Sequence, residues 1–270
     1  MSSSYQPDGE IFPPGDPAGA YIAEEPPAPR RSTRSVLAAP GTYVLLGINC
    51  AVFLWMVLHG VDPASPSPVQ LIHFGANIPA FVLQGQWYRL LTATFVHVGL
   101  IHLLTNMWCL WNLGLLGEPL LGPWGMVAVY LLTGIAGNLL SLLINILRRD
   151  FISVGAGASG AVFGIAGILI VLLSNKRLPI PSLELDRLRR SVIRFAGLNL
   201  VIGLSTIVLP LIRIDNSAHV GGFLSGLALG VPLVPKMTSG RVGYLSRQKI
   251  TFAIAALLLA LFGHWIAKLR

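Results

Sequence analysis

Seven long apolar segments constrain the fold of this chain more than any other feature. They cover residues 41–60, 96–116, 124–147, 157–174, 192–212, 216–235 and 250–267. Each is close to the roughly 20 residues that an α-helix needs to cross a bilayer. Lipid cannot satisfy exposed backbone groups, and the segments are too long and too uniformly apolar for barrel strands, so we expect helices. The predicted fold class is all-α, a polytopic membrane helix bundle.

The composition agrees with a membrane protein and argues against a nucleic-acid-binding one. Apolar residues make up 54% of the 270 and charged residues 11%, and the mean hydropathy is +0.71, which is outside the range of ordinary soluble domains. The formal net charge of +8 comes from basic residues beside the apolar segments, without interleaved aromatic residues. We therefore expect a lipid bilayer as partner and no nucleic acid.

The N-terminal segment 1–40 differs sharply from the rest of the chain. It is rich in Pro, Ser and Gly and carries five of the eleven carboxylates, so it cannot bury enough apolar surface to fold. No cleaved signal peptide is expected, because no basic start followed by an apolar stretch occurs here. The predicted organisation is a disordered cytoplasmic tail (1–40), a core (41–235), and a cytoplasmic linker with a seventh transmembrane helix (236–270).

Basic residues predict the orientation in the membrane. With the N-terminus in the cytoplasm, 13 of the 19 Lys and Arg residues lie on the cytoplasmic side, as the positive-inside rule requires. The C-terminus is then outside. With no organelle transit signature, a bacterial cell membrane is the expected location.

Two polar residues on different predicted helices share one depth in the membrane. Ser159 precedes Lys176 by the same number of positions as His219 precedes Lys236. Both helices run from outside to inside, so each residue lies about 25 Å from the inner boundary of an apolar core about 30 Å thick. Ser159 and His219 are thus expected near the outer face.

The second predicted helix adds two more polar residues to this layer. His102 precedes Glu118 by nearly the same interval and so lies at nearly the same level, and Asn106 lies one turn deeper on the same helix face. Each residue also has a structural explanation, since Ser, His and Asn can bond neighbouring helices, and Gly160, Gly164 and Gly167 resemble a helix-packing face. Four buried polar groups at one depth nevertheless favour a site, because each is costly in lipid.

Acyl transfer is the chemistry that suits these residues. A serine hydroxyl is a weak nucleophile unless a base takes its proton, and His219 is the best-placed base, so we expect a Ser159–His219 dyad. His102, the Asn106 amide and the Ser159 backbone N–H could stabilise an oxyanion.

Other titratable residues suggest no competing scheme. The carboxylates after residue 40 lie mostly in loops, and Asp215 is expected to cap the helix that carries His219 rather than to join the site. Cys50 and Cys109 are expected to act as small apolar residues. No metal site and no cofactor are predicted.

Five short motifs occur in order along the chain. They are Trp87-Tyr88-Arg89; His97, His102 and Asn106; Glu118 with Gly122; Gly157-Ala158-Ser159-Gly160; and Ala218-His219-Val220-Gly221-Gly222 followed by Gly226. In order they resemble the W-R, H-x-x-x-x-H-x-x-x-N, E-x-x-x-G, G-x-S-G and A-H-x-x-G-x-x-x-G motifs of the rhomboid intramembrane serine proteases. A lone G-x-S-G would be weak evidence, whereas this combination, spread over about residues 41–235, is specific.

The resemblance implies six helices around a water-accessible cavity open to the outer face, with a gate near the fifth helix and the first loop embedded beside the bundle. The segment 250–267 would be an added seventh helix. Ser159 and His219 would be catalytic, His102 and Asn106 would form the oxyanion site, and Gly157, Gly160, Phe163 and His97 would support them. Phe163 departs from the family, which commonly has Tyr here.

The implied function is cleavage of transmembrane helices near their outer ends, in single-span or polytopic membrane proteins. Two alternatives compete with it. A non-catalytic relative that binds transmembrane clients usually lacks the serine or the histidine, and this chain has both. A small transporter or channel would have charged residues near the bilayer centre or paired half-segments of unequal length, and neither is found. The oligomeric state and the natural substrate stay open.

Overall fold

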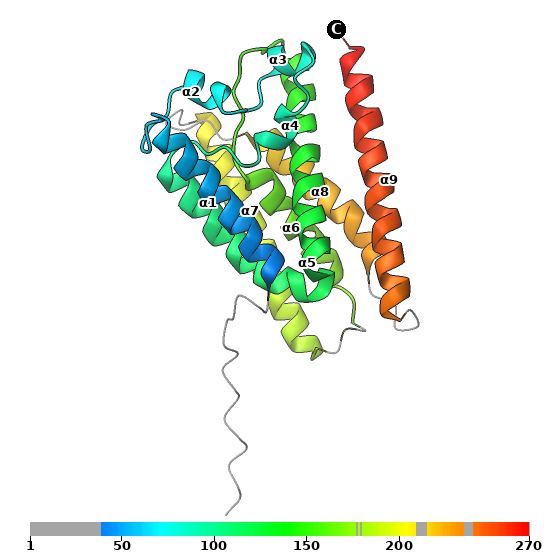
Figure 1. The fold of residues 1–270 in the computed structure, drawn as a ribbon. Helices are drawn as coiled ribbons and strands as arrows, with labels where there is room; N and C mark the ends of the chain where they lie inside the picture. The colour runs from blue at the N-terminus through cyan, green and yellow to red at the C-terminus, as the bar shows by residue number, and fades with distance from the viewer. Residues whose placement is uncertain (1–38, 177, 179, 209–214, 235–239, 270) are drawn as a thin grey trace, which may run out of the picture. The chain divides into compact units, whose positions relative to one another are not determined.

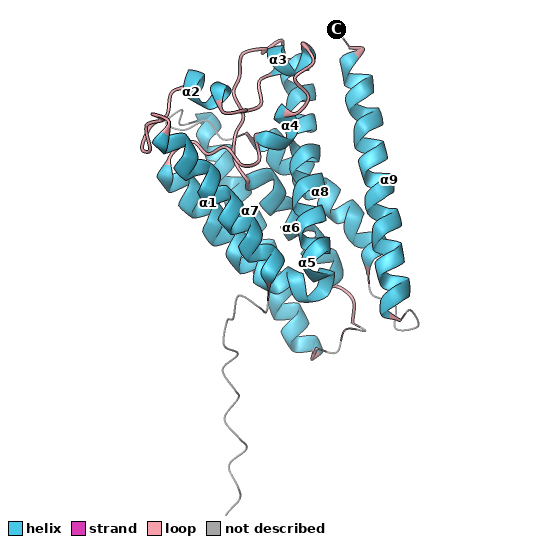
Figure 2. Cartoon of the chain, in the orientation of Figure 1, coloured by secondary structure: helices cyan, strands magenta, loops and turns pink. Residues whose placement is uncertain are grey.

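A computed structural model describes residues 39–176, 178, 180–208, 215–234 and 240–269. The predicted tail therefore falls almost wholly outside the described residues, as does most of the segment that joins the predicted core to the last helix. Throughout the described part the regular secondary structure is helical (Figure 2), apart from one isolated bridge between Asn77 and Gly155. The all-α prediction is confirmed for these residues.

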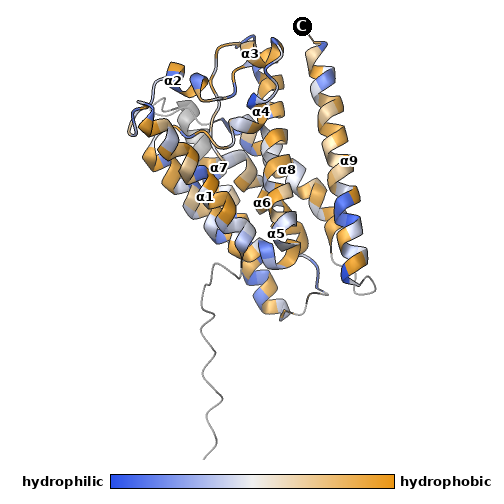
Figure 3. Ribbon diagram, viewed as in Figure 1, coloured by the Kyte–Doolittle hydropathy of each residue, from blue (hydrophilic) through white to orange (hydrophobic). Residues whose placement is uncertain are grey.

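The chain order of the described helices is shown in Figure 1. They are α1 (Pro40–Leu58), α2 (Pro68–His73), α3 (Pro79–Leu83), α4 (Arg89–Thr92), α5 (Leu100–Leu147), α6 (Ser159–Leu172), α7 (Ser182–Val208), α8 (Asn216–Leu233) and α9 (Arg241–Ala267). Every predicted apolar segment overlaps a described helix, two of them within α5, and the ends of the segments 192–212 and 216–235 lie outside the described residues. Helices α7 and α9 begin earlier than predicted, because hydropathy marks only the apolar part of a helix and their first turns are polar (Figure 3).

Three described helices, α1, α5 and α9, are long and apolar enough to cross a membrane, and α6 is a shorter apolar helix. Helix α8 owes its lower apolarity to residues such as Asn216, His219 and its glycines. The chain is thus built as a membrane helix bundle. The division into a six-helix core and one added helix stays a prediction.

Helix α5 consists of two arms that meet at Gly122. This residue has φ of 75° and ψ of 164°, outside the helical region, and it is flanked by Pro119 and Pro123. Glycine adopts positive φ at little cost, while each proline lacks the N–H of an intrahelical bond. Gly122 therefore divides α5 into two helices, which correspond to the predicted segments 96–116 and 124–147.

Helix α6 lies at the centre of the bundle. Eleven of its 14 residues are buried, and it packs against both arms of α5, against α7 and against α8. Its apolar side chains Ile165, Ile168 and Leu169 are fully buried in the main core cluster. The serine that begins this helix is therefore held by one of the most constrained elements of the fold.

The loop between α1 and α5 contains three short helices that the hydropathy pattern did not reveal. Arg89 organises it: its guanidinium is buried and donates to the carbonyl oxygens of Ile72 and Ala76, at 2.7 and 3.0 Å, and to the side chain of Gln86 at 2.7 Å. Elements this short give no periodicity signal, and here a buried cation holds them together.

Glu118 of α5 caps the N-terminus of α1. Its carboxylate is buried and accepts hydrogen bonds from the backbone N–H groups of Gly41 and Thr42, at 2.8 and 2.6 Å, and from the Thr42 hydroxyl at 2.6 Å. Helix α1 has no side-chain cap of its own. A carboxylate at this end satisfies orphan N–H groups and matches the positive end of the helix dipole.

Replacing Glu118 by Ala should destabilise the protein, because three buried donors would lose their acceptor at a cost of about 1–3 kcal/mol for each unsatisfied group. Thermal unfolding in detergent measures this. The matched control is Glu184→Ala, since Glu184 is exposed in the first turn of α7 and its loss should lower the free energy of unfolding by no more than about 1 kcal/mol. Similar midpoints for the two variants would contradict the capping role.

Candidate active site

Helices α6 and α8 approach each other closely enough to touch through their backbones. A Cβ atom built on Gly222 would lie 2.0 Å from the carbonyl oxygen of Gly160, and one built on Gly226 would lie 2.0 Å from that of Gly164. No side chain fits at either position. The predicted role of Gly160 and Gly164 as a packing face is confirmed, and the contact joins the start of α6 to the start of α8.

His219 is held against α6 by an aromatic stack. The rings of Phe163 and His219 lie nearly parallel, with their centroids 4.4 Å apart and their planes at 16°. Phe163 lies one turn after Ser159 on α6, and Gly160 lies beside Ala218, since a Cβ on Gly160 would come 3.3 Å from the Ala218 carbonyl oxygen. The imidazole therefore faces the side of α6 that carries Ser159.

The His219 ring is buried, and one of its nitrogen atoms has no hydrogen-bond partner among the described residues. The residue is only 6% exposed, and its Nδ1 atom is buried without a hydrogen-bond partner among the described residues. Ser159, by contrast, is partly exposed. A buried polar atom without a partner is uncommon and calls for an explanation.

Asp215 caps the start of α8. Its carboxylate is the N-cap, accepting from the Ala218 N–H at 3.0 Å, and it also accepts a hydrogen bond from the Ser141 hydroxyl of α5. The capping prediction is confirmed. Ser141 is a residue that the sequence did not single out, because a serine inside an apolar helix carries no positional signal.

The segment before Ser159 is tied to the loop between α1 and α5. Asn77 and Gly155 exchange two backbone hydrogen bonds of 2.8 Å each, and the Gly157 N–H donates to the carbonyl oxygen of Ala93 at 2.9 Å. Gly157 has φ of 129°, and a Cβ there would lie 2.6 Å from the His102 ring. Glycine is thus required by both conformation and space.

His97 joins the same two segments through its side chain. It is fully buried. Its Nδ1 lies 3.1 Å from the carbonyl oxygen of Phe95, and its Nε2 lies 3.4 Å from the backbone N of Ala158. These partners fit a neutral ring that donates from Nδ1 and accepts at Nε2. His97 therefore positions the backbone immediately before Ser159.

His102 and Asn106 lie on the face of α5 beside this segment. The Nδ1 atom of His102 accepts from the Val98 N–H at 3.2 Å, so its proton belongs on Nε2, on the ring edge that lies against Gly157. The His97 and His102 ring centroids are 5.4 Å apart. Asn106 donates its amide to the His102 carbonyl oxygen at 2.9 Å.

The structure thus gathers the predicted site residues from three helices and one loop. Phe163 and His219 meet at the α6–α8 contact, one turn along α6 from Ser159, while His97, His102 and Gly157 meet just before α6. The amide of Asn106 bonds its own helix rather than a neighbour. Cys109 is buried and Cys50 is exposed, and neither forms a disulfide. Within the described ranges, no group of three or more His, Cys, Asp or Glu side chains could hold a metal ion.

The chain is similar in sequence to rhomboid proteins. The family model described as the Rhomboid domain matches residues 84–236. The rhomboid protease GluP of Bacillus subtilis (strain 168) is 32% identical over 196 residues, which cover 71% of this chain and 35% of that protein. The rhomboid protease AarA of Providencia stuartii is 28% identical over 236 residues, covering 82% of each. RHOMBOID-like protein 5 of Arabidopsis thaliana is 34% identical over 177 residues, covering 66% of this chain and 54% of that protein.

Replacing Gly222 by Ala should force α6 and α8 apart, because the new methyl group would overlap the Gly160 backbone. We expect a loss of about 1–3 kcal/mol in the free energy of unfolding, as for other overpacked positions. The control is Gly47→Ala on α1, where no atom lies within 4 Å of the position that the added methyl group would take. Thermal unfolding of both variants decides the point, and an unchanged Gly222→Ala protein would contradict the close contact.

Proposed function

Because this chain belongs to the rhomboid family, whose domain model matches residues 84–236, we propose that it is an intramembrane serine endopeptidase. One observation carries the proposal. The imidazole of His219 is stacked on Phe163, one turn from Ser159, at a point where the backbones of α6 and α8 touch. This geometry supports a pairing of Ser159 as nucleophile with His219 as base.

In the first chemical step, His219 removes the proton of the Ser159 hydroxyl as the oxygen attacks the carbonyl carbon of a substrate peptide bond. The C–N bond then breaks, and the protonated imidazole returns the proton to the leaving amine. This leaves an acyl group on Ser159. Activation of serine by an adjacent histidine follows the general logic of nucleophilic catalysis. The stack on Phe163 limits rotation of the imidazole, although Phe cannot supply the hydroxyl that the family's usual Tyr carries.

Three donors would stabilise the negative charge on the carbonyl oxygen. Ser159 is the first residue of α6, so its N–H has no partner within the helix and lies at the positive end of the helix dipole. His102 carries its proton on Nε2, beside Gly157. The Asn106 amide would have to leave the His102 carbonyl and turn toward the substrate. Preorganised donors of this kind supply much of the rate enhancement in acyl transfer.

Water completes the cycle by attacking the acyl group, with His219 as the base, which releases the acid product and restores Ser159. The partial exposure of Ser159 is consistent with access of water from that end of the bundle. His97 acts as a positioning residue in this scheme, since it fixes the backbone before Ser159 and contacts neither reacting group. No cofactor enters the chemistry.

The proposed substrates are transmembrane helices of other membrane proteins, single-span or polytopic, cut near the outer face. The basic residues favour a cytoplasmic N-terminus and an external C-terminus, in a bacterial cell membrane. The starts of α1 and α9 lie at the same end of the helix bundle, because both bind the same part of α5. Glu118 accepts from the start of α1, and Tyr244 of α9 donates to the Leu120 carbonyl oxygen at 3.0 Å. The Ser159 end of α6 is then on the opposite side.

Replacing Ser159 by Ala should abolish cleavage of a labelled single-span substrate by purified protein in detergent, and so should replacing His219 by Ala. Each change removes one half of the dyad. Matched controls are Ser174→Ala at the other end of α6 and His59→Ala in the loop after α1, both at exposed positions. These should cleave at the wild-type rate.

Equal cleavage by wild-type protein and Ser159→Ala would remove Ser159 from the mechanism. Binding of the substrate without cleavage by the folded wild-type protein would favour the alternative, a non-catalytic rhomboid-like protein that binds transmembrane clients.

Asn106→Ala should lower kcat by roughly 10- to 1,000-fold with little change in KM, because the lost donor acts on the oxyanion and not on the bound substrate. The matched control is Asn112→Ala. Asn112 lies on the same helix and also donates to the carbonyl four residues back, at 2.7 Å, but is exposed. If both variants lost activity equally, or if neither did, Asn106 would have no part in oxyanion stabilisation.

A further inference from the structure

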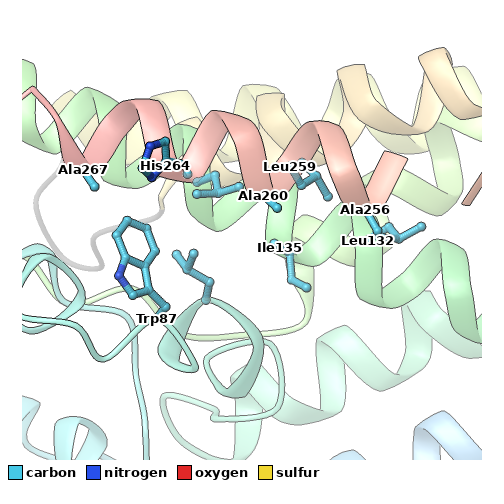
Figure 4. A pocket seen from close by; sticks show the side chains of 11 residues that line it. Trp87, Leu132, Ile135, Ala256, Leu259, Ala260, His264 and Ala267 are labelled. Carbon is cyan, nitrogen blue, oxygen red and sulfur yellow. The ribbon is translucent and has the colours of Figure 1, made fainter. Parts of the chain in front are cut away.

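A cavity of about 490 Å³ lies between α9 and the second arm of α5, away from the Ser159–His219 site. Its walls are almost entirely apolar, with Leu132, Ile135 and Leu139 on α5 facing Ala256, Ala260 and Gly263 on α9. Figure 4 shows Leu132 and Ala256 at one end of this cavity, and Trp87 with His264 at the other. The space exists because α9 presents small residues to a leucine-rich face of α5.

The packing of α9 leaves this space open. Only three of its described residues, Gln248, Gly263 and Ile266, are buried. Near its start, Gln248 donates to the Leu121 carbonyl oxygen at 2.7 Å, and near its end Ile266 packs into a small cluster with Val82 and Leu90. Helix α9 is thus anchored near both ends, while most residues of its middle part are exposed.

The dimensions of the cavity fit one lipid chain. Its α9 wall runs from Ala256 to Ala267, which is about 16 Å along a helix, close to the roughly 15 Å thickness of one leaflet's hydrocarbon. An apolar space of this length, open on one side, suits an acyl chain.

The polar end of the cavity suits a phospholipid headgroup. Trp87 and His264 place ring N–H groups there, and tryptophan is enriched at this level of a bilayer. Lys268 is exposed one turn beyond His264. Its ammonium can reach the phosphate while its stem covers apolar surface.

We propose that this cavity binds one acyl chain of a phospholipid, with the phosphate placed beside Lys268. The bound chain packs between α9, α5 and Trp87, so it joins the last helix to the loop that supports the backbone before Ser159. This binding needs neither Ser159 nor His219 and is independent of the proposed peptidase activity.

Native mass spectrometry of purified protein exchanged from dipalmitoyl phosphatidylglycerol into detergent tests the proposal. Wild-type protein should retain one lipid per chain. Ala260→Phe fills the cavity and should reduce the retained lipid at least tenfold, whereas the matched change Leu258→Phe, on the outward face of α9, should not. Lys268→Gln should reduce retention by about three- to tenfold, the effect of one lost cation near a membrane surface.

Thermal unfolding checks that each variant folds. If Ala260→Phe does not fold, the variant Ala256→Leu, which fills the cavity with a smaller side chain, is used in its place. Equal retention by wild-type and a folded cavity-filling variant would overturn the proposal. So would retention of no lipid by folded wild-type protein, or a dimer that Ala260→Phe dissociates, since a second copy would then be the occupant.

Discussion

The backbone contact between α6 and α8 is the constraint on which the rest of the site depends. Gly222 and Gly226 lie against the carbonyl oxygens of Gly160 and Gly164, where even a methyl group would overlap. This contact sets the separation of the two helices at their first turns. Only at that separation can the His219 ring stack on Phe163, because any larger side chain in the contact would move the imidazole away from α6.

A second set of interactions holds the start of α6 from the other side. Backbone bonds from Asn77 and Ala93, together with the His97 side chain, fix the segment between Gly155 and Ala158. The loop between α1 and α5 is thus part of the site's scaffold rather than a connection around it. Its own shape comes from buried polar groups, above all Arg89, which explains how such short helices hold their positions in it.

The fold class and most of the candidate site could be predicted from the sequence, for specific physical reasons. The membrane requires long apolar helices, so hydropathy located all seven segments. The depths of Ser159 and His219 in the membrane could be predicted by counting residues back from Lys176 and Lys236, because basic residues after a helix mark the inner boundary. The break near Gly122 was predicted, but the early starts of α7 and α9 were missed, since hydropathy marks only the apolar part of a helix.

Contacts between distant residues could not be read from the sequence. Glu118 is part of a motif, yet its role as the cap of α1 depends on a residue 77 positions away. Ser141 and its bond to Asp215 left no periodic or compositional trace. The same holds for the cavity beside α9, which arises from small residues on one helix opposite large ones on another. Such features depend on which faces meet, and only the folded arrangement shows them.

The most direct measurement of the central claim is the rate at which a fluorophosphonate modifies Ser159, followed by mass spectrometry of the peptide that contains it. An activated serine beside its base should be labelled readily in the wild-type protein and at least roughly 100-fold more slowly after His219→Ala, in line with the size of general-base catalysis. Labelling of Ser159 at the same rate in both folded proteins would contradict the account, since the imidazole would then have no effect on the hydroxyl.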